Sequence, residues 1–141
     1  MNDLKDKTAI VSGGSDGIGL AIARKLSLKG AYVIICARNE DKLSIAIEKI
    51  RHEGGKCEAK VLDVSATEEY SQMITDVAKK HGLDILVNNA AHVGMGLIKD
   101  VNLDEFQKNF RTNVDAPYAG TKAAMVAMSE KGGSIINVSS V

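Results

Sequence analysis

Residues that could take part in chemistry gather where short apolar runs end. The stretch Ser12–Gly19 reads Ser-Gly-Gly-Ser-Asp-Gly-Ile-Gly and directly follows the β-branched run Thr8–Val11. Gly13 allows a tight turn, Gly17 allows an anion to approach bare backbone, and Gly19 allows a following helix to pack close to the strand. Free N–H groups and the positive end of that helix would hold a pyrophosphate.

This loop has the spacing Gly-x-x-x-Gly-x-Gly and not the commoner Gly-x-Gly-x-x-Gly. A plain tight turn between a strand and a helix would explain the glycines equally simply. Asp16 is unfavourable next to a pyrophosphate, because a carboxylate repels it. We therefore expect Asp16 to cap the helix start and to point away from the ligand.

The residues after the second apolar run bear on which nucleotide would bind. In dinucleotide sites for NAD an acidic residue about 20 positions past the glycines binds the ribose 2′-hydroxyl. Here the chain reads Cys36-Ala37-Arg38-Asn39, so the acid is missing and a guanidinium that suits a 2′-phosphate follows. The pattern favours NADP(H) over NAD(H), although a solvated Arg38 paired with Glu40 or Asp41 is the alternative.

Five β-branched or apolar runs predict the strands that position these residues. They lie at residues 8–11, 32–36, 59–64, 84–87 and 134–138. Amphipathic segments separate them, and the first places Ile18, Ala21, Ile22 and Leu26 on one stripe. Ser65–Glu68 has capping-box spacing. The longest helical region is expected from about Leu103 to Ser129, with an irregularity at Pro117.

Strands separated by helices of this length imply parallel pairing through right-handed crossovers. The fold predicted is a doubly wound α/β (Rossmann) sheet in one dinucleotide-binding domain over residues 1–141. Lysine plus arginine equals aspartate plus glutamate, 18 against 18, so charge gives no reason to expect nucleic acid or an anionic membrane as a partner. No apolar run approaches the length of about 20 residues that spans a bilayer.

Neither the cysteines nor the histidines form a ligand pattern. Cys36 and Cys57 are far apart, in strand-like runs, and are expected to be buried free thiols in a reducing compartment, which predicts a cytoplasmic location. His52, His81 and His92 are scattered near helix ends or in a loop, so solvated positions explain them better than a metal site. His92 could also face a substrate.

With these pieces in place, the chain resembles the short-chain dehydrogenase/reductase family from about Lys5 to Val141. The loop Ser12–Gly19 resembles the family's T-G-x-x-x-G-I-G, and Asp63-Val64 matches the pair set against the adenine. Asn88–Ala91 resembles N-N-A-G with Ala91 in place of glycine, and Ile136–Ser140 resembles the end of the fifth strand. The resemblance implies the strand order 3-2-1-4-5 within a family sheet of seven strands. The cofactor-binding residues expected are Gly13, Ser15, Asp16, Gly17, Ile18, Gly19, Arg38, Asp63, Val64, Asn89, Ala90 and Ala91.

The resemblance also implies part of a catalytic tetrad of asparagine, serine, tyrosine and lysine. Asn113 matches the asparagine, which would hold a water in a proton relay, and Ser140 matches the serine that bonds the substrate oxygen. Without the resemblance Asn113 would be interpreted as a helix-bending amide and Ser140 as a strand-end turn residue. The family's Tyr-x-x-x-Lys follows the serine by somewhat more than a dozen residues, beyond Val141. The domain is accordingly expected to be incomplete at its C-terminus.

Three hypotheses remain open at this stage. The first is an oxidoreductase that transfers a hydride between NADP(H) and a small carbonyl or alcohol substrate, of which this chain is the amino-terminal part. The second is a non-catalytic chain that binds dinucleotide, and the third is an inactive, truncated product. For a complete protein the family implies a homo-oligomer whose interface includes the long fourth helical region.

Overall fold

The computed structural model describes residues 3–140. The chain alternates strands and helices in the order β1 (Thr8–Ser12), α1 (Gly17–Leu28), β2 (Tyr32–Ala37), α2 (Glu40–His52), β3 (Lys56–Val61), α3 (Thr67–His81), β4 (Ile85–Asn88), α4 (Leu103–Phe110), η1 (Arg111–Asp115), α5 (Ala116–Ala127) and β5 (Ser134–Asn137).

The strands form one parallel five-stranded sheet in the order β3-β2-β1-β4-β5, which confirms the predicted doubly wound fold. The register runs evenly from Thr8 opposite Tyr32 to Ser12 opposite Cys36. Because every strand points the same way, the residues that follow them meet at one edge of the sheet. The order reverses on either side of β1, and the loop Ser12–Gly19 begins at that point.

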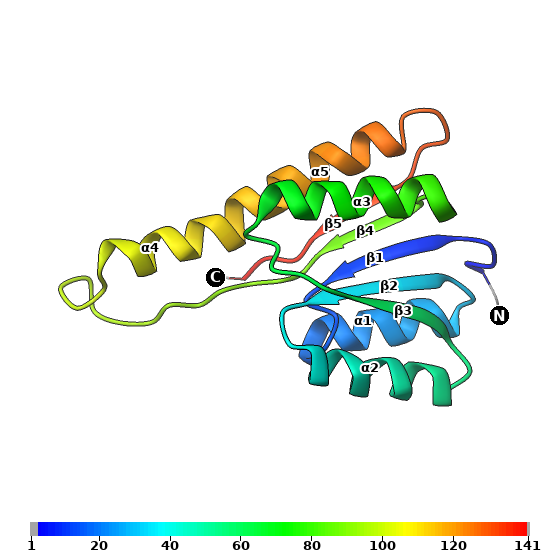
Figure 1. Cartoon of the computed structure of the whole chain (residues 1–141), viewed down its shortest axis with the longest axis horizontal. Helices are drawn as coiled ribbons and strands as arrows, with labels where there is room; N and C mark the ends of the chain where they lie inside the picture. The colour runs from blue at the N-terminus through cyan, green and yellow to red at the C-terminus, as the bar shows by residue number, and fades with distance from the viewer. Residues whose placement is uncertain (1–2, 141) are drawn as a thin grey trace.

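Helices cover both faces of the sheet, as Figure 1 shows. Helices α1 and α2 pack on one face, and α3 and α5 pack on the other. Helix α4 extends beyond the carboxyl edge, where a long loop connects it to β4 (Figure 1). The layering buries the central strands on both sides, so all five residues of β1 are buried.

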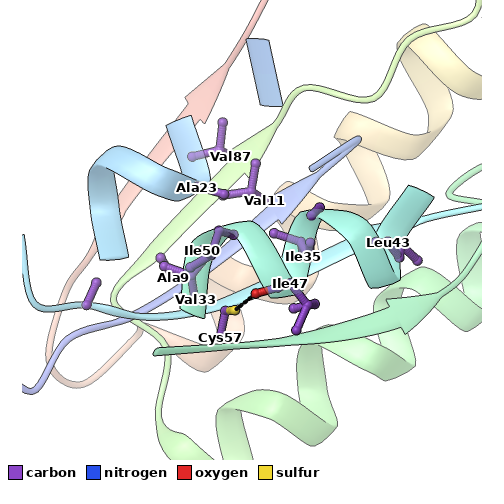
Figure 2. Close-up of a cluster of buried hydrophobic side chains, with 12 residues drawn as sticks. Ala9, Val11, Ala23, Val33, Ile35, Leu43, Ile47, Ile50, Cys57 and Val87 are labelled. Carbon is purple, nitrogen blue, oxygen red and sulfur yellow. Dashed lines mark hydrogen bonds between the residues drawn. The ribbon is translucent and has the colours of Figure 1, made fainter. Parts of the chain in front are cut away.

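Two apolar clusters hold the layers together. The first, drawn in Figure 2, joins strand residues such as Val11, Val33 and Ile35 to Leu43 and Ile50 of α2. The second joins the opposite face of the same strands to α3 and α5. Burying each such aliphatic side chain stabilises the fold by about 1.5–3 kcal/mol. The sheet edge that carries the polar loops is thereby fixed from both sides.

The third strand and the helix after it differ from the sequence prediction. Strand β3 ends at Val61, so Asp63 and Val64 lie in the following loop and not in a strand over 59–64. This is an edge strand whose ladder with β2 sets its ends, and its mixed polarity hides them in the sequence. The predicted capping box is not formed: Ser65 bonds back to Asp63, and α3 starts at Thr67 without a side-chain cap.

The long helical region is confirmed, and its irregularity is a π turn. Segment η1 is π-helical, and the N–H of Ala116 bonds the carbonyl of Arg111 five residues back. Pro117 follows directly, has no N–H to donate and crowds the carbonyl of Asn113 four residues before it. An inserted π turn relieves this conflict without ending the helix.

Helix α1 presents a different face to the sheet from the one predicted. Its buried residues are Gly19, Ala23 and Ser27, while Ile18 in its first turn is 65% exposed. The apolar stripe of the sequence misled here because the helix approaches the sheet through its small residues, which allow a close contact. Leu20, Ile22 and Leu26 still pack against the rim of that cluster.

Candidate functional site

The loop between β1 and α1 has a shape that its glycines alone permit. Gly13 adopts φ +64°, and its N–H donates to the carbonyl of Cys36 at 2.8 Å. A Cβ on Gly13 would lie 2.9 Å from the Ala90 Cα, and one on Gly19 would overlap the carbonyl oxygen of Gly13. The predicted roles of Gly13 in the turn and of Gly19 in close packing agree with this geometry.

Ser12 and Asn89 join this loop to the end of β4. The Ser12 hydroxyl accepts the N–H groups of Asn89 and Ala90 at 3.0 and 3.1 Å. The Asn89 amide donates back to the carbonyls of Ser12 and Gly13. Asn89 is therefore a positioning residue for the loop, with its side chain on backbone oxygens, and this pairing of Ser12 with Asn89 was not predicted.

Asp16 caps α1, as expected, but it also lines the cavity at the carboxyl edge of the sheet, so its pointing away from a ligand there stays a prediction. Its carboxylate accepts the N–H of Gly17 at 2.7 Å and an ammonium hydrogen of Lys42 at 3.0 Å. The hydrogen bond from Lys42, the one from Gly17 and the charge of Lys42 hold the pKa of Asp16 below its usual range. Gly17, at φ +48°, and the exposed Ile18 begin the helix beside the cap.

A cavity of about 500 Å³ lies at the carboxyl edge of the sheet and gathers most of the predicted binding residues. Its lining includes Gly13, Ser15, Asp16, Arg38, Asp63, Val64, Ala90 and Ala91 from that prediction. Asn39, Lys42, His92 and Thr112 also line it and were not predicted to bind the cofactor. A volume of this size is typical of small-molecule sites, and its place at the switch point of the sheet is where such folds bind ligands.

Arg38 stands exposed at the end of β2 and lines this cavity. Among residues 3–140 neither Glu40 nor Asp41 forms an ion pair with it, although its exposure is also what a solvated loop arginine would show. No carboxylate occupies the position at the end of β2. The guanidinium is available to a phosphate in the cavity.

Asp63 lines the same cavity. Partial burial alone would raise the pKa of Asp63, but the hydroxyl and N–H of Ser65, at 2.7 and 2.9 Å, outweigh it and keep the pKa below its usual value. The charge of Arg38 adds to this effect. Asp63 is therefore an ionised hydrogen-bond acceptor that could receive an amino or hydroxyl group of an adenosine.

Asn113 holds the loop after β4. Its amide donates to the carbonyl of His92 at 2.7 Å and accepts the N–H of His92 at 2.8 Å. Asn109 and Glu105, four and eight residues before Asn113, also contact this loop. The Asn109 side chain accepts the N–H of Gly94, and the Glu105 carboxylate lies 2.6 Å from the His92 ring. A single sequence gives no signal for this row, because it depends on where the loop folds back.

Ser140 follows β5 at the same edge of the sheet and is exposed. Strand β5 is tied to β4 through the Asn88 amide, which donates to the Asn137 side-chain oxygen at 2.8 Å, and through the Val138 N–H on the Asn88 carbonyl. Asn113 and Ser140 thus both lie beyond the carboxyl ends of the central strands. Their roles in catalysis stay predictions.

Tyr32, Tyr70 and Tyr118 all lie outside the lining of the cavity that contains Arg38. The Tyr70 hydroxyl is buried on Asn88, where burial raises its pKa, and burial together with Glu58 raises the pKa of Tyr32 to about 12. Tyr118 precedes Lys122 by four residues, the spacing of the family's pair, yet both line a groove between α3 and α5 and neither lines the cavity of Arg38. Within residues 3–140 no tyrosine lines that cavity.

Residues 3–140 contain no cluster of three or more histidine, cysteine or acidic side chains placed to hold a metal ion. No helix in this part of the chain combines the length and the hydropathy needed to cross a membrane. Cys36 and Cys57 are buried free thiols, as predicted.

The fold is an α/β fold of the Rossmann type, with a cavity at the switch point of its sheet. Residues 7–141 match the family described as short chain dehydrogenase. The chain therefore belongs to the short-chain dehydrogenase/reductase family.

One curated relative and two solved structures illustrate the similarity, at 28–38% sequence identity. The human dehydrogenase/reductase SDR family member 4 is 37% identical over 141 residues, which cover 98% of this chain and 51% of that protein. A metagenomic short-chain oxidoreductase solved with NADP is 38% identical with a TM-score of 0.92, over 99% of this chain and 64% of that one. A xylitol dehydrogenase solved with NAD⁺ is 28% identical with a TM-score of 0.90, over 97% and 54%. The chain spans about half the length of the curated relatives it matches.

Proposed function

We propose that the protein carrying this chain is an oxidoreductase that transfers a hydride between NADP(H) and a carbonyl or alcohol substrate. The nicotinamide would supply the hydride to a carbonyl carbon or accept it from an alcohol carbon. The residues of this chain would bind the dinucleotide: the N–H groups of the loop Gly13–Gly19 at the pyrophosphate, Asp63 with Val64 at the adenine, and Ala90 with Ala91 along the middle of the cofactor. Asn113 and Ser140 would take part in proton transfer and in holding the substrate oxygen.

The observation that carries the choice of NADP(H) is Arg38 in the lining of the cavity, where among residues 3–140 no carboxylate forms an ion pair with it. A carboxylate at the end of β2 would bind a ribose 2′-hydroxyl and repel a 2′-phosphate, whereas a guanidinium binds the phosphate by charge and by two parallel hydrogen bonds. Similar folds include one solved with NADP and one solved with NAD⁺, so the choice rests on Arg38 and not on likeness.

The test is to change Arg38→Asp in the protein as encoded, together with any sequence beyond residue 141. Loss of a charge-assisted hydrogen bond and gain of repulsion should weaken NADPH binding about 100-fold. NADH binding should be kept or improved. Lys5→Asp, the same charge reversal at an exposed residue before β1, is the matched control. Equal NADPH affinity before and after Arg38→Asp would refute the assignment.

The second candidate is a chain that binds dinucleotide without turning it over. It is favoured by one observation, namely that no tyrosine among residues 3–140 lines the cavity. Oxidation of NADPH by the encoded protein over a panel of ketones and aldehydes separates the two. Binding without oxidation of NADPH would support the second candidate.

We also propose that the complete protein is a homo-oligomer that acts in the cytoplasm. An apolar stripe runs along α4, η1 and α5, and each of its residues is about half or more exposed. It consists of Phe106, Phe110, Val114 and Tyr118. Exposed apolar patches of this kind commonly mark protein interfaces. The two free thiols fit a reducing compartment.

A further inference from the structure

A second cation stands at the mouth of the dinucleotide cavity. Lys42 lies in the first turn of α2, where its N–H is fixed by the Asn39 side chain at 2.9 Å, and it lines the cavity together with Arg38. Its ammonium group lies 3.0 Å from the Asp16 carboxylate. The backbone of Lys42 is thus anchored, while its side chain is 57% exposed.

The negative charge of Asp16 in the cavity lining is balanced by the second cation, Lys42. The charged residues that line the cavity are Asp16 and Asp63 against Arg38 and Lys42, so the charges of the wall sum to zero. A ligand with a pyrophosphate and a further phosphate would enter beside the ionised Asp16. With Lys42 on Asp16 that repulsion is reduced, and Arg38 alone is left to face the extra phosphate.

We propose that Lys42 is the exchangeable cation of the 2′-phosphate subsite and that its pairing with Asp16 sets how strongly the cavity prefers NADP(H) over NAD(H). This inference rests on the proposed function. When a 2′-phosphate binds next to Arg38, Lys42 leaves Asp16 for the phosphate, which carries more charge than one carboxylate. An exposed ion pair is cheap to break, and the flexible four-carbon stem of lysine allows the change of partner. A ligand with a free 2′-hydroxyl gives Lys42 no reason to leave Asp16.

The experiment compares two nucleotides that differ by this one phosphate, 2′,5′-ADP and 5′-AMP, with NADPH and NADH as the complete pair. Calorimetric titration of the encoded protein would use the variants Lys42→Met and Asp16→Asn. Methionine keeps a long unbranched side chain without the charge, and asparagine keeps a good helix cap without the charge. Lys49→Met, an exposed lysine on the same helix that does not line the cavity, is the control.

We expect Lys42→Met to weaken 2′,5′-ADP about tenfold, as for one lost charge-assisted hydrogen bond, and to leave 5′-AMP within about twofold. Asp16→Asn should strengthen 2′,5′-ADP severalfold, because Lys42 is then released to the phosphate. The control should change neither. Equal weakening of both nucleotides by Lys42→Met, or no change at all, overturns the inference. A wild-type protein that binds neither dinucleotide overturns the proposed function itself.

Discussion

Replacing Gly19 by alanine sets two physical effects against each other. Gly19 is the third residue of α1, and a Gly→Ala change inside a helix ordinarily stabilises it by about 0.5–1 kcal/mol. In this fold a Cβ there would overlap the carbonyl oxygen of Gly13 and come within 2.5 Å of the Asn89 amide nitrogen. Helix propensity therefore predicts that the added methyl group raises the free energy of unfolding, and tertiary packing predicts that it lowers it.

The packing effect should win. Overfilling a tight site costs about 1–3 kcal/mol, and here the closest neighbour is backbone that cannot rotate away. The Gly13 carbonyl also accepts a hydrogen bond from Asn89, so moving it strains a second contact. Subtracting the helical gain leaves a net loss of roughly 0–2.5 kcal/mol in the free energy of unfolding, with a midpoint of about 1 kcal/mol. A displaced loop also moves N–H groups away from the pyrophosphate, which should weaken NADPH roughly tenfold.

Urea unfolding gives the stability change, and titration of NADPH fluorescence gives the affinity. Gly54→Ala is the control, because Gly54 has φ +87°, open space around its Cβ position and a place in the turn between α2 and β3. It should cost about 1 kcal/mol through backbone strain alone and leave the affinity unchanged. A Gly19→Ala protein as stable as wild type, with unaltered NADPH affinity, would refute the packing argument.

Two further predictions concern stability away from the cavity. Burial alone would raise the pKa of Asp84, but the Thr8 N–H at 2.9 Å and Lys7 lower it below 3.8 overall. A lowered folded pKa stabilises the protein above the unfolded pKa, and this contribution is lost as the pH falls through the folded pKa. Asp84→Asn should thus cost about 0.5–1 kcal/mol at pH 7 and progressively less below pH ~4, as measured by denaturation across pH. Removing the buried Asn88 side chain should cost about 2–3 kcal/mol, because the Tyr70 hydroxyl loses its acceptor. Tyr70→Phe should then cost less in the Asn88→Ala protein than in wild type, and strict additivity in urea unfolding would contradict this coupling.

The sequence pattern predicted a doubly wound parallel sheet and the loop with the spacing Gly-x-x-x-Gly-x-Gly, since these depend on local pattern and on the chirality of crossovers, and the family resemblance supplied the strand order. It also indicated Arg38, because the position of one residue after a buried strand is a local property. The sequence predictions that were wrong concern residues whose structure depends on contacts with other segments of the chain. The pairing of an edge strand moved the end of β3 to Val61, and close packing by small residues turned Ile18 to the outside of α1.

The sequence by itself predicted a dinucleotide site, because glycine spacing and the residue after β2 encode backbone shape and charge within a few positions. Only the tertiary structure decided which residues share the cavity. Lys42 meets Asp16 across 26 positions, and Asn113 meets His92 across 21. Such contacts form only when the crossovers bring distant segments to one edge of the sheet, and no local pattern records which side chains then come within hydrogen-bond distance.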